Sequence, residues 1–126
     1  MPLTAGEKSI EINGGNVVYE ILGATTDPAR TIAPTPGGRF SKDIPGLRPL
    51  AQALVDGGYR VLLWDRPNCG KSDVQFYGQS ESHMRAETLA TLITELGLGP
   101  CVIAGGSGGA VRGAFLAPRE AATWAR

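Results

Sequence analysis

Apolar residues along the chain follow two spacings, one typical of β-strands and one typical of amphipathic helices. Short apolar runs at 9–12 and 17–22 flank the polar stretch 13–16. Two strand-like runs joined by a turn that contains Asn-Gly predict an antiparallel hairpin at the start of the chain.

A strand and a helix are predicted next. Residues 31–33 form a short, weak strand that Pro34 is expected to end, because proline cannot donate to a β-ladder. One face of a helix then follows at the spacing of three and four residues: Leu47, Leu50, Ala51 and Leu54. The pair Gly57-Gly58 is expected to end this helix as a C-cap.

The remainder of the chain repeats the alternation. Residues 60–64 are a continuous apolar run, typical of a strand buried on both faces in a parallel sheet. A polar loop at 65–79 leads to a second helix, at about 82–96. Its buried face is predicted to hold Leu89, Leu92, Ile93 and Leu96, and Gly97 closes it. A strand at 101–104 and a helical stretch from about Ala110 follow.

Strands that alternate with helices predict an α/β fold with three α/β/α layers, a mostly parallel sheet and an N-terminal antiparallel hairpin. In such sheets, ligands bind beyond the carboxyl ends of the strands. Three loops meet this condition, at 34–43, 65–79 and 105–109. The whole chain, 1–126, is interpreted as a single partial domain.

Composition narrows the function. The 12 basic and 12 acidic residues balance and form no basic run, which argues against nucleic-acid binding. Two cysteines, Cys69 and Cys101, are too few for a disulfide framework, and Cys101 is predicted to be a core residue. No signal peptide or membrane-length apolar stretch is present, so we expect a cytoplasmic protein that acts on a small molecule without a membrane partner.

The clearest chemical motif is Gly105-Gly106-Ser107-Gly108-Gly109, directly after a predicted strand and before a predicted helix. This is a G-x-S-x-G nucleophile elbow in the context that the motif requires. Glycines on either side leave room for the cramped turn that exposes the serine. The following helix directs its N-terminal amides at Ser107, so the Gly108 amide is a candidate oxyanion donor. A plain glycine-rich turn with an idle serine is the structural alternative.

Nucleotide binding is disfavoured by two missing glycines. Gly70-Lys71-Ser72 looks like the end of a phosphate-binding loop, but Asp65 stands where that motif needs its first glycine. The 105–109 cluster also fails the dinucleotide fingerprint, because Val111 occupies the position of its last small residue.

Four segments in order resemble the α/β-hydrolase superfamily. Residues 34–38 match its oxyanion loop, 61–73 its strand-four segment, 82–96 the helix before the elbow and 105–109 the elbow itself. The resemblance implies the N-terminal half of that fold, Ser107 as nucleophile, and the amides of Gly38 and Gly108 as the oxyanion hole. It implies no metal and no cofactor. Pro36 replaces the usual histidine of the oxyanion loop. A serine nucleophile disfavours epoxide hydrolase and dehalogenase chemistry and leaves ester, amide and C–C bonds open.

The acid and the histidine that the resemblance requires after the serine are missing. The only carboxylate after Ser107 is Glu120, and the sole histidine, His83, falls near the start of the preceding helix. No Val/Leu-rich strand follows, so 101–104 is expected to be an exposed sheet edge that invites self-association. We therefore expect a truncated serine hydrolase of little activity, a gene fragment or frameshift product. The alternative is a non-catalytic protein that associates through half the fold.

Overall fold

The computed structural model describes residues 3–35, 41–73, 81–99, 101–105 and 124–125. The elements, in chain order, are β1 (Lys8–Ile12), β2 (Gly15–Leu22), a 3-10 turn η1 (Pro28–Arg30), β3 (Thr31–Thr35), α1 (Leu47–Asp56), β4 (Arg60–Trp64), α2 (Glu81–Glu95), β5 (Cys101–Gly105) and β6 (Trp124–Ala125). The predicted order of strands and helices is confirmed from β1 to β5. The predicted helix from about Ala110 lies outside the described residues.

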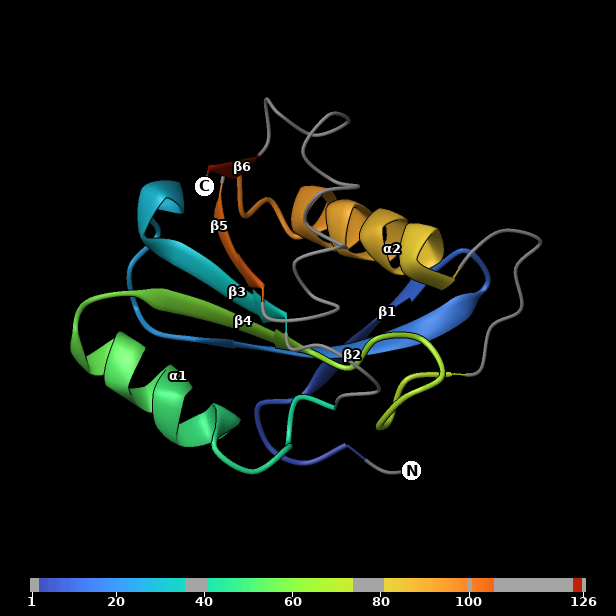
Figure 1. Ribbon diagram of the computed structural model, residues 1–126, viewed down its shortest axis with the longest axis horizontal. Helices are drawn as coiled ribbons and strands as arrows, with labels where there is room; N and C mark the ends of the chain where they lie inside the picture. The colour runs from blue at the N-terminus through green and yellow to red at the C-terminus, as the bar shows by residue number, and fades with distance from the viewer. Residues whose placement is uncertain (1–2, 36–40, 74–80, 100, 106–123, 126) are drawn as a thin grey trace.

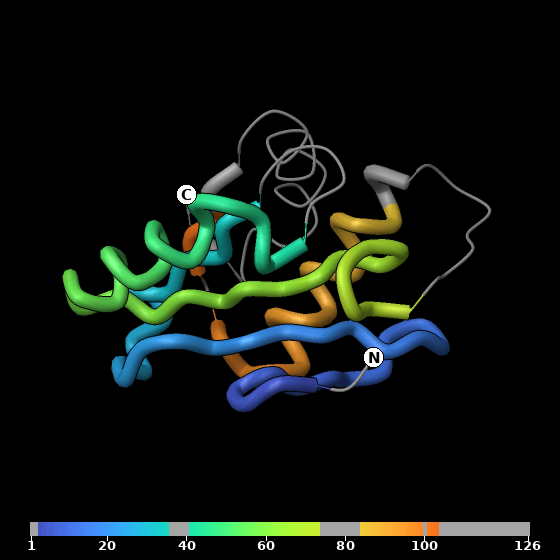
Figure 2. The backbone as a smooth tube through the Cα atoms, turned by 90° about the horizontal axis from the view of Figure 1, so that it is seen from below, coloured from blue at the N-terminus to red at the C-terminus, as the bar shows by residue number. Residues whose placement is uncertain are grey.

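The strands form one sheet in the order β1-β2-β4-β3-β5-β6. β1, β2 and β4 pair antiparallel, whereas β3 pairs parallel with both β4 and β5, and β5 with β6. Figure 1 shows α1 on one face of the sheet and α2 on the other, and Figure 2 shows β2 and β4 running side by side. The sheet is therefore mixed and mostly parallel with an N-terminal hairpin, as predicted.

The hairpin turn is tighter than the sequence indicated. Ile12 pairs with Gly15, so the loop consists of Asn13 and Gly14 alone. Both have positive φ, 53° and 85°, as a type I′ turn requires. Asn-Gly is the pair that best tolerates this geometry, so the strand begins at Gly15 and not at Val17.

The expectation that Pro34 ends the third strand is wrong. β3 continues to Thr35, and Pro34 pairs with Ala104 of β5. On the other side of β3, the described pairing with β4 covers only Thr31 and Ile32. The missing N–H of Pro34 therefore interrupts no described pair with β4, while β3 continues to pair with β5 through Thr35.

Both helices end in the same hydrogen-bonded motif. At the end of α1, Gly58 has φ of 92° while its N–H donates to the Val55 carbonyl and the Tyr59 N–H donates to the Leu54 carbonyl. Gly97 does the same after α2, with φ of 63°. These are Schellman motifs, in which a left-handed glycine lets the chain satisfy the last carbonyls of the helix. The predicted C-caps are thus confirmed.

The predicted buried face of α1 is wrong at one position. Leu47 and Ala51 are buried, but Leu50 is 51% exposed. Leu54 and Val55 complete the contact with the sheet instead. The helix is rotated so that the i, i+4, i+7, i+8 positions face the sheet, and the apolar spacing alone could not choose between the two adjacent faces.

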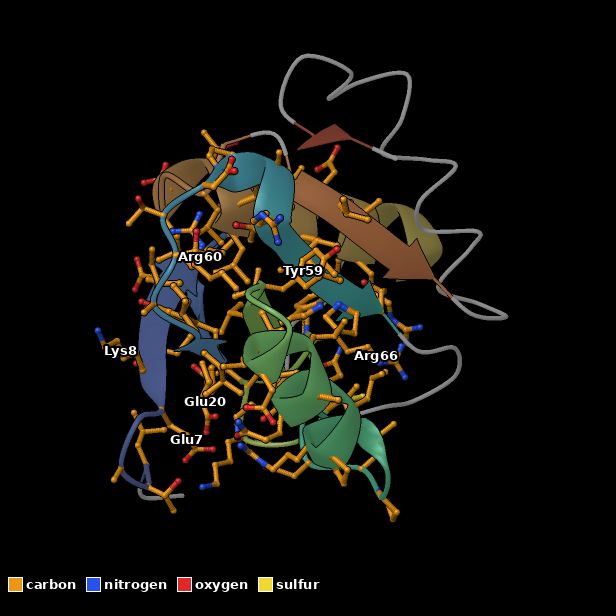
Figure 3. All side chains as sticks on the ribbon, turned by 90° about the vertical axis from the view of Figure 1, so that its left-hand side faces the viewer. Glu7, Lys8, Glu20, Tyr59, Arg60 and Arg66 are labelled. Carbon is orange, nitrogen blue, oxygen red and sulfur yellow. The ribbon has the colours of Figure 1, made fainter. Side chains whose placement is uncertain are left out.

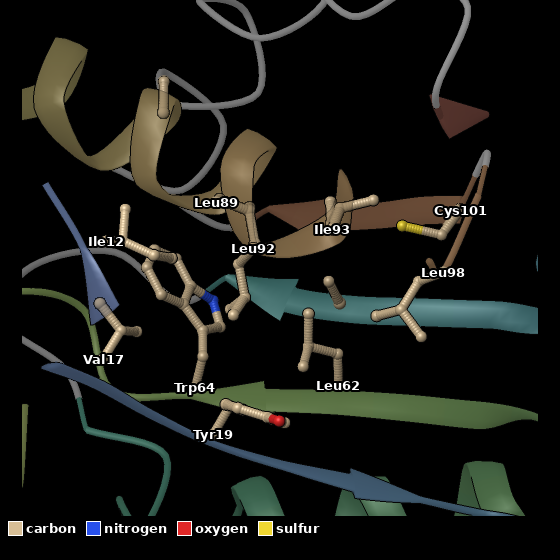
Figure 4. Packing of buried hydrophobic residues seen from close by; sticks show 12 residues of the cluster. Ile12, Val17, Tyr19, Leu62, Trp64, Leu89, Leu92, Ile93, Leu98 and Cys101 are labelled. Atoms are coloured by element: carbon tan, nitrogen blue, oxygen red, sulfur yellow. The ribbon is translucent and has the colours of Figure 1, made fainter. Parts of the chain in front are cut away.

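The predicted face of α2 is confirmed. Leu89, Leu92 and Ile93 are buried, and Leu96 packs at the margin of the same cluster. Figure 4 shows the side chains of Leu89, Leu92 and Ile93 in one cluster with Trp64 and Leu62 of β4 and Tyr19 of β2. Cys101 is buried in this cluster as well, which confirms it as a core residue.

The expected free edge at β5 is only partly correct. Cys101 pairs with Trp124 and Val102 with Ala125, so a two-residue strand, β6, covers the start of β5. No sequence pattern predicts this strand, because two residues are too few to show an alternation. The expectation of an exposed edge is therefore wrong at Cys101 and Val102.

Candidate active site

Most of the predicted site residues lie outside the described residues. Gly105 is described and is the last residue of β5. The structure does not describe the other predicted site residues, which are Gly38, Gly106, Ser107, Gly108 and Gly109. What the structure gives is therefore the framework from which the predicted oxyanion loop and elbow extend.

That framework aligns the ends of two strands. Thr35, the last residue of β3, pairs directly with Gly105, the last residue of β5. The strands are parallel, so the chain leaves both in the same direction at the same edge of the sheet. Thr35 is fully buried, and its hydroxyl donates to the Ala33 carbonyl at 3.3 Å. The loops that carry Gly38 and Ser107 therefore start from neighbouring, rigidly paired positions.

A third loop begins at the same edge, after β4, and Asp65 organises it. The Asp65 side chain is fully buried, and its backbone N–H donates to the Val18 carbonyl at 2.9 Å. Its Oδ1 accepts the backbone N–H of Lys42 at 2.6 Å, and its Oδ2 accepts that of Lys71 at 3.0 Å. One carboxylate thus joins the loops that follow β3 and β4. Hydrogen bonds from backbone amides to a charged acceptor are among the stronger ones in proteins.

Gly70 is required for this arrangement. A Cβ at position 70 would lie 2.3 Å from Cγ of Asp65, and the residue has φ of 55°. The carboxylate cannot move aside without losing both of its backbone donors. A side chain at position 70 would therefore break the contact between Asp65 and the loop.

Ser72 and Asp73 fasten the loop to β2. The Ser72 Oγ accepts the Val18 N–H at 2.9 Å and donates to the Asp65 carbonyl. Asp73 exchanges two bonds with Asn16, each 2.9 Å long. The Ser72 hydroxyl is occupied by hydrogen bonds to the protein's own backbone, and the next helix that the structure describes, α2, begins at Glu81. This agrees with the sequence argument against a phosphate-binding loop at Gly70-Lys71-Ser72.

A buried carboxylate from the N-terminal segment reaches the same two loops. Glu7, directly before β1, has a side chain only 1% exposed and forms ion pairs with Lys42 and Lys71, the second at 2.6 Å. Its Oε1 also accepts the N–H and hydroxyl of Thr4, at 2.7 and 2.8 Å. Lys42 is itself fully buried. In Figure 3, Glu7 lies beside α1 together with Glu20, while Lys8 points away.

A second set of charges extends this network toward α1. Arg48 makes a bidentate pair with Glu20, both bonds 2.9 Å long, and also binds Asp43. Asp43 in turn accepts from the Lys42 ammonium at 2.9 Å. The Arg48 side chain is 42% exposed, so its pairs are screened by water and contribute less than those of Glu7.

The neighbouring charges shift the pKa values of Glu7 and Lys42. Burial alone would raise the pKa of Glu7, but hydrogen bonds from Lys42, Lys71 and Thr4 outweigh it and hold that pKa far below its ordinary value of 4.5. Burial alone would likewise lower the pKa of Lys42, and Glu7 and Asp43 raise it instead. Both groups are therefore charged at neutral pH, and burial makes their mutual attraction stronger than it would be in water.

Other candidate residues have ordinary structural positions. His83 lies in the first turn of α2, the helix-start position predicted for it. Burial raises the pKa of the Cys101 thiol to about 11, which suits an inert core residue. Glu120 lies outside the described residues. Within the ranges that the structure describes, no three His, Cys, Asp or Glu side chains gather as metal ligands, and no helix is long and apolar enough to cross a membrane.

The sequence argument missed Glu7 and Lys42. Their contact spans 35 positions in the chain, and neither residue belongs to a recognisable motif. For Asp65 a signal did exist, since it opens the segment that resembles the strand-four loop and Gly70 follows at close range. Glu7 and Lys42 are recognisable only by the burial of their charges, and no local sequence pattern predicts that burial.

The fold has clear counterparts among known proteins. Cfl2 from Burkholderia cenocepacia superposes with a TM-score of 0.80 at 21% identity, over 94% of this chain and 38% of that one. The α/β-hydrolase MGS-M2 from a deep-sea metagenome gives 0.81 at 19% identity, over 94% and 42%. Epoxide hydrolase VrEH1 from Vigna radiata gives 0.79 at 18% identity, over 94% and 37%.

These comparisons define the class: the chain has the α/β-hydrolase fold, over a stretch about two fifths as long as the solved chains it matches. No family model matches it. In sequence, it is 44% identical over 45 residues to the 2-hydroxy-6-oxononadienedioate/2-hydroxy-6-oxononatrienedioate hydrolase of Klebsiella pneumoniae, which covers 36% of this chain and 16% of that protein.

Proposed function

We propose that this chain carries the nucleophile half of a serine hydrolase. Ser107 is the nucleophile, and the backbone amides of Gly38 and Gly108 form the oxyanion hole. The observation that supports the proposal most is the pairing of Thr35 with Gly105, because it sets the starts of the two loops side by side. A nucleophile and its oxyanion donors must lie about 3 Å from one reacting group, so they need adjacent supports.

The reaction follows from these roles. The Ser107 oxygen bonds to the carbonyl carbon of the substrate while a base takes the hydroxyl proton. The carbonyl oxygen becomes an oxyanion that accepts the Gly38 and Gly108 amides. The leaving group departs with a proton, and water then releases the acyl group from the serine. Esters, amides and C–C bonds beside a carbonyl all suit this sequence of steps.

The substrate class has one direct pointer. The Klebsiella relative is named for an unsaturated hydroxy-oxo dicarboxylate. An oxo-acid of that kind presents a carbonyl carbon to a serine, which is the chemistry proposed for Ser107. We therefore place unsaturated oxo-acids beside simple esters as the first substrates to test.

The base is the part that these 126 residues lack. The only histidine is His83, on α2, and the only later carboxylate is Glu120. Without a base the serine keeps only the residual rate that an oxyanion hole and binding supply. The isolated chain is therefore expected to acylate slowly and to gain rate when a base is added.

The test is covalent labelling of Ser107 with and without added imidazole. The chain is incubated with a fluorophosphonate or an activated ester, and the adduct is located by mass spectrometry. We expect a slow adduct at Ser107 that forms at least 10-fold faster with imidazole, which replaces the missing base. Ser107→Ala should abolish it, and Ser9→Ala, which changes an exposed serine on β1, should not.

Absence of any Ser107-dependent adduct under both conditions would overturn this function. It would favour the alternative, a protein without catalysis that associates with another chain through this half of the fold. Light scattering on the same sample separates the two further, because the alternative predicts an oligomer or a complex.

A further inference from the structure

We propose that Glu7 and Asp65 form a double clamp that fixes the spacing between the loop after β3 and the loop after β4, and that both are positioning residues for the Gly38 segment. The effect on catalysis rests on the function proposed above. The clamp itself rests only on contacts between described residues.

Two lysines are each held at both ends by these carboxylates. Asp65 accepts the backbone N–H of Lys42 and that of Lys71. Glu7 accepts the side-chain ammonium of the same Lys42 and the same Lys71. Each lysine therefore has its main chain fixed by one acid and its side chain fixed by the other. An ordinary surface ion pair restrains only the far end of a flexible side chain.

The clamp holds Lys42, which lies just after the segment that carries Gly38. That segment, 36–40, runs between Thr35 and Ser41. Upstream, Thr35 is fixed by its pairing with Gly105. Downstream, Lys42 is fixed by Asp65 and Glu7, and both its main chain and its side chain are buried. Both anchors lie within a few residues of this segment in sequence, which is the ground for assigning the clamp a positioning role.

The chemistry of the contacts suits a positioning role. Glu7, Asp65, Lys42 and Lys71 together carry two negative and two positive charges, and Glu20 and Asp43 also form ion pairs with Lys42. The Glu7 and Lys42 side chains are 1% and 0% exposed, so solvent competes little for them. Charge-assisted hydrogen bonds are short and directional, whereas apolar contacts permit sliding. The cost of removing two charges from water offsets most of the attraction between them, so a buried ion pair adds little net stability. This favours a role for the Glu7 pairs in positioning the loops over a role in stabilising the fold.

The Thr4–Glu7 turn thereby becomes part of the site's support. Thr4 donates twice to Glu7 and fixes the orientation of the carboxylate. Residues at the very start of the chain would thus influence a reaction at its far end.

Amide hydrogen exchange tests the clamp without any need for activity. In Glu7→Gln, which keeps size and removes charge, we expect the Lys42 amide to exchange at least 10-fold faster while the amides of Leu62 and Leu63 in β4 are unchanged. Glu11→Gln makes the same chemical change at an exposed position of β1 and should alter neither. No change at Lys42, or an equal rise throughout β4, would overturn the clamp.

Lys71→Met is the second variant, because Lys71 is 18% exposed and its loss leaves the Glu7–Lys42 pair intact. We expect the backbone amide at position 71, which donates to Asp65, to exchange faster. An unchanged rate there would also contradict the clamp.

The catalytic role is tested by the rate of Ser107 adduct formation with imidazole, below the unfolding transition of every variant. We expect Glu7→Gln to lower the rate at saturating probe about 10-fold and to leave the half-saturating concentration unchanged. An equal rate in Glu7→Gln and Glu11→Gln would remove the catalytic role. If the wild-type chain forms no adduct at all, the proposed function fails, and the exchange rates alone decide the clamp.

Discussion

The two faces of the sheet are held by different forces. Among the residues that the structure describes, the α2 face buries twelve in one cluster, including Trp64 and Leu92. The cluster on the α1 face has four buried members within the same described ranges, and beside it lie the charges of Glu7, Lys42 and Glu20. One face is thus a conventional apolar core, and the other combines a small core with a buried ionic network.

Strand β4 contributes side chains to both faces of the sheet. Leu62 and Trp64 belong to the α2 cluster, whereas Val61 and Leu63 belong to the α1 cluster. Alternate residues of a strand point to opposite faces, so a continuous apolar run serves both. The apolar burial that stabilises the fold is therefore concentrated on the α2 face, while the α1 face supplies the directional contacts that reach the candidate site.

The largest effect is expected on the α2 face. Leu92→Ala removes a fully buried side chain and should lower the free energy of unfolding by about 2–5 kcal/mol. Leu54→Ala, the matched change on the partly buried α1 side, should cost less. Chemical denaturation of both variants measures the difference. An equal or greater loss from Leu54→Ala would show that the two faces do not differ in this way.

An intermediate and pH-dependent effect is expected at Glu7. Its pKa is lowered on folding, so its charge stabilises the fold above the ordinary value of 4.5, and that stability is lost as the pH falls below it. Glu7→Gln should therefore cost about 1–3 kcal/mol at pH 7 and progressively less below pH 4.5. Denaturation midpoints across this range measure it, with Glu11→Gln as control. A difference that stays constant with pH would argue against an ionised Glu7.

The smallest effect is expected at Leu50. This side chain is exposed on α1, so Leu50→Lys removes little buried area and should change the free energy of unfolding by less than about 0.5 kcal/mol. The same thermal or chemical transition measures it. A loss comparable to that of Leu54→Ala would mean that another surface covers Leu50.

Sequence reasoning predicted the elements well where the signal is local. The β4 run, the α2 face and the glycines at 58 and 97 all follow from spacing and backbone preference, and each is confirmed. The predictions were wrong where contacts between elements distant in the sequence determine the structure. Pro34 was expected to end β3, but the strand continues through it to Thr35 in its pairing with β5. The site residues Ser107, Gly38 and Gly108 stay predictions from motif and resemblance.

Local sequence patterns were enough to predict the alternation of strands and helices and an Asn-Gly hairpin turn, because these depend on residues a few positions apart. The G-x-S-x-G elbow stays a prediction from the same kind of local pattern. The buried face of α1 and the contacts of Glu7 with Lys42 and Lys71 became known only from the folded chain. The contact between Glu7 and Lys71 spans 64 positions. No periodicity encodes a contact at that range, since it arises only when the sheet brings the N-terminal segment and the loops after β3 and β4 to one place.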